Sequence, residues 1–233
     1  FNLNIFQINR TLNQVNSDEL KNKYLIQVFD RYATYNGSSP YKTPGMMTLI
    51  QHLENHYGTF IPDGGMYEIT NAIFKLAKQV GVKFHFDCNV DEIILEKNNA
   101  RKIRVNEKLI ESDIIVSNVD VNFTYNQLLK QKFKHRSLKN ESSSSALIFY
   151  WGIKGTYDEL DLHNIFFSSN YKEEFNSIFE KKEIFDDPTV YVNISSKDIS
   201  MDAPKNSENW FVMINAPYLS LIHISEPTRP SLI

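Results

Sequence analysis

A change of hydrophobic period at Gly81 constrains the fold more than any other feature of this sequence. Before it, apolar side chains recur at helical spacing over residues 66–80. After it, apolar and polar residues alternate over residues 82–88, which is typical of a strand with one buried face. The turn residues that introduce the helix include Gly64 and Gly65. A helix followed at once by a strand predicts an α/β arrangement.

The next segment extends this arrangement. Residues 90–95 and 102–105 flank Asn98-Asn99, and they predict a β-hairpin because asparagine tolerates a positive φ. Residues 114–116 are apolar throughout, as expected of a strand covered on both faces. Helix, strand, hairpin and buried strand suit the second half of a nucleotide-binding domain. In such a domain Ser117 and Asn118 would lie at the ligand-binding edge of the sheet.

The flanking segments predict further elements. Apolar spacing predicts helices over residues 17–32, with Ser17 as the cap, and over residues 46–57. The polar stretch 130–145 reads as a connection, which places a domain boundary near residue 130. Beyond it the expected elements are strands at 146–153, 189–194 and 210–214, and a helix at 172–179. This half is therefore expected to be mixed α+β.

Composition excludes several classes of protein. The 233 residues are 42% hydrophobic, and 25 basic against 28 acidic side chains give a net charge of −3. That balance recruits neither nucleic acid nor anionic lipid. The lone Cys88 and the absence of a leader-like segment favour the cytoplasm. No apolar run reaches the roughly 18 residues that span a bilayer, so any membrane contact is expected to be peripheral and hydrophobic.

Both ends of the chain are expected to depart from the natural protein. The sequence starts with Phe1 inside a structured-looking segment, so we expect a piece of a longer protein. Residues 219–229 read LSLIHISEPTR, which looks like the translation of a sequencing adapter. We therefore expect residues 219–233 to be a non-native tail that packs against nothing. The alternative is a genuine C-terminal loop.

Motifs of known chemistry are few. His52 and His56 are spaced to share one helix face, but no third ligand accompanies them, so no metal site is expected. The eight glycines nowhere form GxGxxG or a phosphate loop, and no GxSxG elbow is present. The residues alone therefore predict half of a nucleotide-binding domain followed by a second domain, and they predict no specific chemistry.

A family resemblance carries the reading further. Ordered motifs over residues 28–218 resemble the bacterial-type phytoene desaturases, which are flavin enzymes that dehydrogenate carotenoids. The matching stretches are FDRYATYNGSSPY (29–41), LIQHLE (49–54), IPDGGMYEI (61–69), DIIVSNVDVNFTY (113–125), HNIFFSSNYKEEF (163–175) and DPTVY (187–191). The family's N-terminal GxGxxG strand and its C-terminal flavin-contacting motif are absent from this chain.

The resemblance implies a division of the chain. Residues 1–60 would be a helical part for substrate and membrane docking, and residues 61–130 the middle of a Rossmann-like FAD-binding domain. Residues 131–218 would form a mixed-sheet substrate domain, so the fold class is α/β with α+β. We expect an enzyme that is peripheral to the cytoplasmic membrane, and we expect the present chain alone to be inactive.

The resemblance also implies site residues. Val90 matches a position whose backbone contacts the adenine of FAD, and Ser117, Asn118, Gly64 and Gly65 match segments near the cofactor. For the glycines the alternative is a tight turn, and for Val90 an ordinary core position. Residues for the substrate channel are Arg31, Tyr32 and Tyr35, where the alternative for Arg31 is a structural ion pair or a solvated helix end. The sequence identifies no catalytic base.

The implied reaction passes a hydride from an allylic C–H to FAD, with quinone or oxygen as the final electron acceptor. The substrate would be phytoene or a hydroxylated carotenoid. Alternatives with the same fold are a carotenoid isomerase, a retinol-saturase-like reductase and a non-catalytic isoprenoid-binding protein of the Rab-escort type. An upstream GxGxxG followed by an acidic residue would favour a flavin enzyme over the binding protein.

Overall fold

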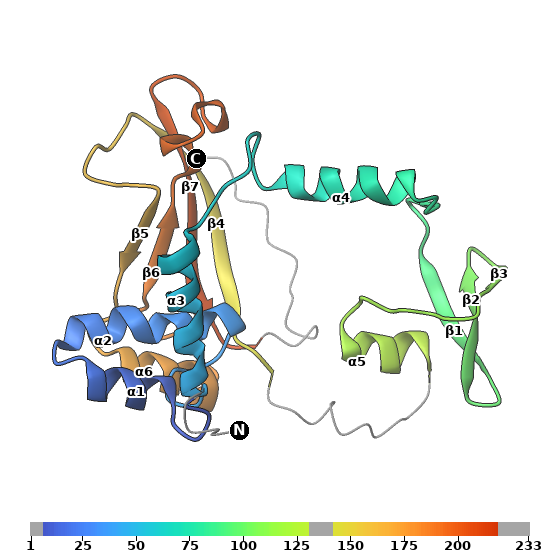
Figure 1. The fold of residues 1–233 in the computed structure, drawn as a ribbon, viewed down its shortest axis with the longest axis horizontal. Coiled ribbons are helices and arrows are strands. Elements are labelled where there is room, and N and C mark those ends of the chain that lie inside the picture. The colour runs from blue at the N-terminus through green and yellow to red at the C-terminus, as the bar shows by residue number, and fades with distance from the viewer. Residues whose placement is uncertain (1–6, 131–141, 219–233) are drawn as a thin grey trace. The chain divides into compact units, whose positions relative to one another are not determined.

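The computed structural model describes residues 7–130 and 142–218, which form two compact units. The larger unit combines Phe1–Glu68 with Ser142–Ile233, and the smaller is Ile69–Glu141. Each unit is described by itself below (Figure 1). The proposed tail at 219–233 lies outside the described residues.

The larger unit begins with two short helices where the sequence predicts one. Helix α1 (Leu12–Glu19) starts at Thr11, whose side chain accepts from the Gln14 N–H while the Gln14 side chain accepts from the Thr11 N–H. Helix α2 (Lys23–Asp30) has its own cap at Asn22. The predicted cap at Ser17 is wrong, because Ser17 lies inside α1. The pair of caps stops and restarts the helix despite the continuous apolar spacing.

Further helices follow in this unit. The 3₁₀ helix η2 (Arg31–Asn36) continues α2, and η3 (Gly45–Met47) leads into α3 (Thr48–Tyr57). The predicted helix over 46–57 is confirmed. It ends at Gly58, whose φ of 81° is a conformation that glycine adopts readily.

An antiparallel sheet of four strands dominates the larger unit. Its order is β4 (Ser145–Lys154), β7 (Ser207–Ala216), β6 (Val190–Asn193) and β5 (His163–Phe166). The three predicted strands are confirmed, whereas β5 is too short for its alternation to be recognised in the sequence. The predicted helix at 172–179 appears as α6 (Tyr171–Asn176), which continues as the π-helical η6 (Ser177–Lys181). The short 3₁₀ helices η7 (Ser195–Lys197) and η8 (Ser200–Asp202) precede β7.

The core of this unit has two centres. On one face of the sheet, Val192, Ile194 and Val212 are buried against Leu160, Val190 and Trp210. The second centre surrounds α6, where Tyr171, Phe175, Ile178 and Phe179 pack against Tyr41 and Phe167. The first cluster packs one face of the sheet, and the second packs α6 and η6 against the segments around Tyr41 and Phe167.

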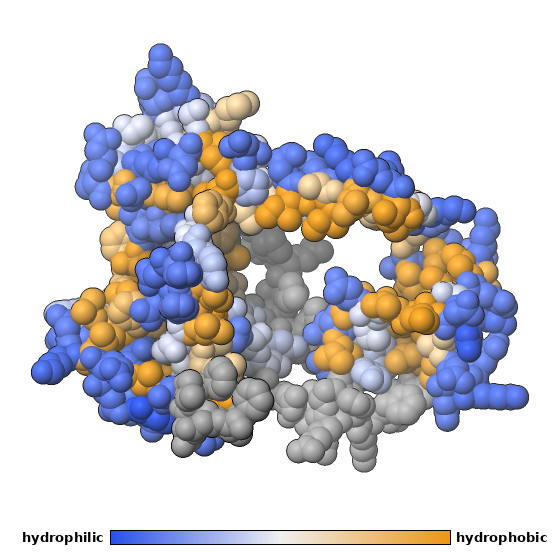
Figure 2. Space-filling model, viewed as in Figure 1, coloured by the Kyte–Doolittle hydropathy of each residue, from blue (hydrophilic) through white to orange (hydrophobic). Residues whose placement is uncertain are grey.

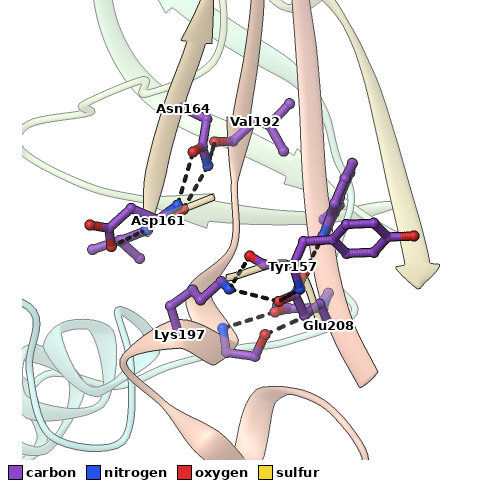
Figure 3. A network of polar contacts seen from close by, with 10 residues as sticks. Tyr157, Asp161, Asn164, Val192, Lys197 and Glu208 are labelled. Atoms are coloured by element: carbon purple, nitrogen blue, oxygen red, sulfur yellow. Dashed lines mark hydrogen bonds and ion pairs between the residues drawn. The ribbon is translucent and has the colours of Figure 1, made fainter. Parts of the chain in front are cut away.

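A network of polar contacts lies beside the cluster of Val192, Ile194 and Val212 (Figure 3). The Glu208 side chain is 3% exposed and pairs with Lys197, with 2.8 Å between Oε1 and Nζ. The Tyr157 N–H and the Trp210 indole N–H also donate to this carboxylate, and Lys197 donates to the Tyr157 carbonyl. Every strong polar group of this buried corner therefore has a partner.

The smaller unit contains the helix α4 (Tyr67–Gln79), which confirms the prediction for residues 66–80. It also contains a meander of three antiparallel strands, β1 (Val90–Glu96), β2 (Asn99–Val105) and β3 (Lys108–Glu111). The predicted hairpin is confirmed, although its turn is centred on Lys97-Asn98, both at positive φ. The third strand was not predicted. The helices α5 (Val121–Phe123) and η4 (Thr124–Leu128) complete the unit.

Two predicted strands of the smaller unit are absent from the described structure. Residues 82–88 form no strand, and Asp87 interrupts them with a positive φ of 55°. Phe84 and Phe86 nevertheless share one side and pack on Phe74 of α4, as their alternation indicates. Residues 114–116 are also unpaired, and Ile114 and Val116 are 77% and 86% exposed. A strand forms only beside a neighbour that completes its hydrogen bonds, which sequence periodicity cannot supply.

Apolar surface is consequently abundant on this unit. Figure 2 shows hydrophobic side chains gathered along one side of α4. Among the described residues of the unit, Ile93 and Leu128 are its only buried hydrophobic side chains. The chain thus has a mixed α and β architecture with two antiparallel sheets, consistent with the coarser part of the predicted fold class. No helix within the described ranges is long and apolar enough to span a membrane.

Candidate functional site

The candidate site lies on the second face of the four-stranded sheet, which we call the pocket face. His163 pairs with Asn193, Asn193 with Phe211, and Phe211 with Tyr150. Directly paired residues point to the same side, so these four side chains form one row across the strands. Tyr191 and Met213 form part of the next row on the same face. The pocket face is therefore largely aromatic and apolar, with polar groups toward β5.

A pocket of about 1260 Å³ opens on this face, all of it within the larger unit. The loop 59–66 forms one wall, and His163, Tyr191, Asn193 and Phe211 form the sheet wall. Residues 195 and 198–202 close a further side. The volume exceeds the range of about 300–1000 Å³ that is usual for small-molecule sites, so it suits a large ligand.

The glycines predicted near the cofactor belong to this wall. Gly64 and Gly65 have φ of 86° and 90°. The Gly65 N–H donates to the Pro62 carbonyl and closes a tight turn. A Cβ at Gly65 would meet no atom within 4 Å. The turn therefore needs glycine for its backbone conformation, while a role at the cofactor stays a prediction.

The three predicted channel residues lie beside the pocket face. The Arg31 guanidinium carbon lies 5.0 Å from the centre of the Tyr191 ring. In the described parts of the chain its recorded contact is this ring and not a carboxylate, which does not support the ion-pair alternative. A guanidinium over an aromatic face is held by a cation–π attraction.

Tyr32 and Tyr35 share one partner on α3. Their hydroxyls donate to Glu54 Oε2 and Oε1 at 2.7 and 3.0 Å. Burial, together with the hydrogen bond and the charge of Glu54, raises the pKa of both phenols. Burial also raises the pKa of Tyr191, although Arg31 opposes the shift. The structure thus brings Arg31, Tyr32 and Tyr35 together and keeps the phenols neutral at ordinary pH.

The remaining predicted cofactor residues lie in the smaller unit. Val90 is half-buried, begins β1 and pairs with Val105. The Ser117 hydroxyl lies 2.8 Å from that of Thr124, at the start of η4. Val90, Ser117 and Asn118 belong to the smaller unit, whereas the pocket belongs to the larger one.

The residues present fit only part of FAD. The half-buried Val90 and the polar residues Ser117 and Asn118 are the predicted contacts for one end of the dinucleotide. The chain contains no glycine-rich loop to hold the pyrophosphate.

The two histidines of α3 do not extend into a metal site. The rings of His52 and His56 are stacked at 5.5 Å between centres. In the portion of the chain that the structure describes, no group of three or more metal-binding side chains comes together.

The structure reveals three polar residues of the pocket that were not predicted as site residues: His163, Tyr191 and Asn193. The first lies in the stretch HNIFFSSNYKEEF and the second in DPTVY, both of which carry the family resemblance. The signal was therefore present, but the missed strand β5 hid the pairing of His163 with Asn193.

The sheet and its pocket define a mixed α/β protein with a large pocket of mixed polar and apolar lining. Comparison with known proteins identifies its relatives. No family model matches the chain. A 1-hydroxycarotenoid 3,4-desaturase from Flavobacterium sp. is 53% identical over 90% of this chain and 43% of its own length. A phytoene desaturase from Neurospora crassa is 29% identical over 89% of this chain and 37% of its own length.

A solved structure agrees with these relatives. The crystal structure of an oxidoreductase from Methanosarcina mazei matches with a TM-score of 0.59 and 15% identity. It covers 91% of this chain and 48% of that protein, and it shows likeness of fold alone. The family resemblance is confirmed: the chain is a homologue of the carotenoid desaturases. It spans less than half the length of the relatives that it matches.

Proposed function

We propose that the natural protein desaturates a carotenoid, such as phytoene or a hydroxycarotenoid, in carotenoid biosynthesis. The observation that carries this proposal is the 53% identity with a 1-hydroxycarotenoid 3,4-desaturase over 90% of the chain. The pocket supports it, because a long polyene needs a large apolar surface and the pocket face supplies one.

FAD is the proposed cofactor, and when bound it would supply the acceptor for the hydride that leaves an allylic C–H. Quinone or oxygen is the proposed final acceptor. The chain's own contribution is to align the substrate and to exclude water. Phe211 and Tyr191 present aromatic surface to the substrate, and the cluster of Arg31, Tyr32 and Tyr35 would border the channel.

The proposed roles of the parts of the chain follow from the family resemblance. Residues 61–130 would form the middle of the Rossmann-like FAD domain, where Val90, Ser117, Asn118, Gly64 and Gly65 are the proposed cofactor contacts. Residues 131–218 would form the substrate domain, and residues 1–60 the docking part. The exposed Ile8, Tyr24, Leu25 and Met46 support docking at a membrane surface, and the half-buried Ile26 adjoins them. We place the protein in the cytoplasm, peripheral to the membrane.

Expression of the natural full-length protein in cells that accumulate phytoene or an acyclic hydroxycarotenoid tests the activity. The expected product has one or more additional conjugated double bonds, seen as a longer-wavelength absorption band and a mass lower by two hydrogens per step. An unchanged mass with altered geometry would indicate an isomerase, and a gain of hydrogen a reductase. Tight binding of the carotenoid without any product would indicate the isoprenoid-binding alternative.

A second test addresses the cofactor. The 233-residue chain is expected to purify without stoichiometric flavin, because phosphate contacts at a glycine-rich loop supply much of dinucleotide recognition. The natural full-length protein is expected to carry the flavin absorbance. A stoichiometric flavin absorbance band on the 233-residue chain would show that FAD binds without the glycine-rich loop and would contradict this expectation.

A further inference from the structure

Three polar side chains form a connected group on the pocket face. His163 of β5 pairs directly with Asn193 of β6, and Tyr191 lies two residues before Asn193 on the same face. His163 Nδ1 lies 2.8 Å from the Tyr191 hydroxyl oxygen and 3.3 Å from Asn193 Nδ2. All three residues line the pocket, and His163 is exposed to it.

The hydrogen bonds of Asn193 indicate which nitrogen of His163 carries the proton. Asn193 Nδ2 donates to the backbone carbonyl of Leu162 at 3.0 Å, which identifies that atom as the amide nitrogen. An amide nitrogen only donates, and its second hydrogen is shared between the Tyr191 hydroxyl and His163 Nδ1, so we assign Nδ1 as an acceptor. A neutral imidazole that accepts at Nδ1 carries its proton on Nε2.

The same logic orients Tyr191. The Tyr191 hydroxyl is the shorter contact of Nδ1 and, with Nδ1 as acceptor, donates to its single lone pair. The Tyr191 ring is held in turn by Arg31 on one side and contacts Phe211 at 6.4 Å between centres. The His163 ring is therefore held in one orientation, and within the described parts of the chain its Nε2 has no hydrogen-bond partner.

The surroundings select the chemistry of a ligand group at this donor. Asp63, Asp198 and Asp202 line the same pocket, and their negative charges disfavour an anionic group. Asp202 is itself bonded to the Ser195 hydroxyl. Phe60, Met66 and Phe211 also line the pocket and give it apolar surface for the remainder of a ligand. A neutral oxygen on an otherwise hydrocarbon molecule satisfies both conditions.

We propose that His163 binds the hydroxyl oxygen of a hydroxylated carotenoid through Nε2–H, with Tyr191 and Asn193 as positioning residues. This inference rests on the proposed desaturase function and names the substrate class within it. The printed name of the Flavobacterium relative places a hydroxyl at position 1 and the new double bond at positions 3 and 4. A group that holds this hydroxyl would thus fix the register of the polyene close to the reacting bond.

The test compares two substrates on the natural full-length enzyme: a 1-hydroxycarotenoid and the same carotenoid without the hydroxyl. His163→Phe is expected to lower kcat/KM for the hydroxylated substrate by roughly 10-fold or more, and to leave the other substrate within about 2-fold. His163→Gln, which keeps an N–H donor near the Nε2 position, is expected to restore most of the preference. His52→Phe makes the same change at an exposed histidine outside the pocket and is expected to keep it.

The positioning residues give a graded result. Tyr191→Phe and Asn193→Leu are expected to reduce the preference less than His163→Phe, mainly through KM, because the donor remains but is held less firmly. Equal losses on both substrates for His163→Phe, with no rescue by glutamine, would assign His163 a structural role and overturn the inference. Failure of the wild-type enzyme to convert either carotenoid would instead overturn the proposed function.

Discussion

The buried carboxylate of Glu174 accepts two hydrogen bonds from one residue, Thr189. The Thr189 N–H lies 3.0 Å from Oε1, and its hydroxyl lies 2.6 Å from Oε2. This pair ties α6 to the start of β6 beside the pocket face. Burial outweighs these bonds and raises the pKa of Glu174. Glu208 shows the opposite balance: burial acts to raise its pKa, but hydrogen bonds and Lys197 together lower it.

The two glutamates are therefore expected to respond to pH in opposite ways. Because the folded pKa of Glu174 is raised, this residue contributes most to stability below its unfolded pKa of about 4.3. The difference in free energy of unfolding between wild type and Glu174→Gln should therefore fall as pH rises through the folded pKa. The advantage of wild type over Glu208→Gln should be present above that unfolded pKa and fade as pH falls through the lowered one. Urea midpoints of the three proteins from about pH 2 to pH 7 measure both trends, because the Glu208 trend lies below its unfolded pKa. Slopes of the same sign would contradict the assignment.

The start of α1 gives a second prediction. Thr11→Ala removes one half of the reciprocal cap and should lower the free energy of unfolding by about 1 kcal/mol. Ser17→Ala, at the position that the apolar spacing indicates, should change it by less than about 0.5 kcal/mol, because Ser17 is exposed inside the helix. Urea unfolding of both variants measures the difference. A larger loss of stability for Ser17→Ala than for Thr11→Ala would instead favour a single helix that starts at Ser17.

The phenols bound to Glu54 give a third prediction. Glu54→Gln removes the negative charge that helps to raise the pKa of Tyr32 and Tyr35, so both should ionise at lower pH than in wild type. Tyrosinate ultraviolet absorbance during an alkaline titration measures this shift. Glu19→Gln, at an exposed position on α1, is the control and should leave the curve unchanged. Superimposable curves for Glu54→Gln and wild type would argue against the shared hydrogen bonds.

Membrane docking gives a fourth prediction. The natural full-length protein should float with liposomes at both low and high salt, because burial of apolar side chains is not screened whereas charge attraction falls off over about 8 Å. Leu25→Ser combined with Met46→Ser should weaken flotation. Leu109→Ser, at an exposed leucine of β3, should leave it unchanged. Release by salt alone would rule out hydrophobic docking.

Local patterns predicted much of the fold. The helices over 46–57 and 66–80, the hairpin and the three longer strands of the second half follow from periodicity and turn residues. Errors arose where a local alternative or a distant partner decides the outcome. Thr11 and Asn22 divide a continuous apolar stripe, and residues 82–88 and 114–116 have strand patterns without a neighbouring strand in the described structure.

The site was predicted only in part. The motif around Arg31 indicated the channel cluster, but its contact with Tyr191 joins residues 160 positions apart in the chain, which no local pattern reveals. Glu54 is the last residue of the family motif LIQHLE, which gives it no role, although its carboxylate binds both tyrosines. His163 required the register of β5 against β6, and a four-residue strand carries too little alternation to supply it.

The two sheets differ in how far along the chain their partners lie, and this affects the order of their formation during synthesis. The β1–β3 meander pairs residues across two-residue turns, so it can close within microseconds of leaving the ribosome. Strand β4 pairs with β7 from Lys154↔Ser207 to Ser145↔Ala216, so it must wait for more than fifty further residues. At a translation rate of about 5–20 residues per second, the apolar β4 strand stays without its partner β7 for several seconds, and its apolar side chains are exposed to other chains during that time.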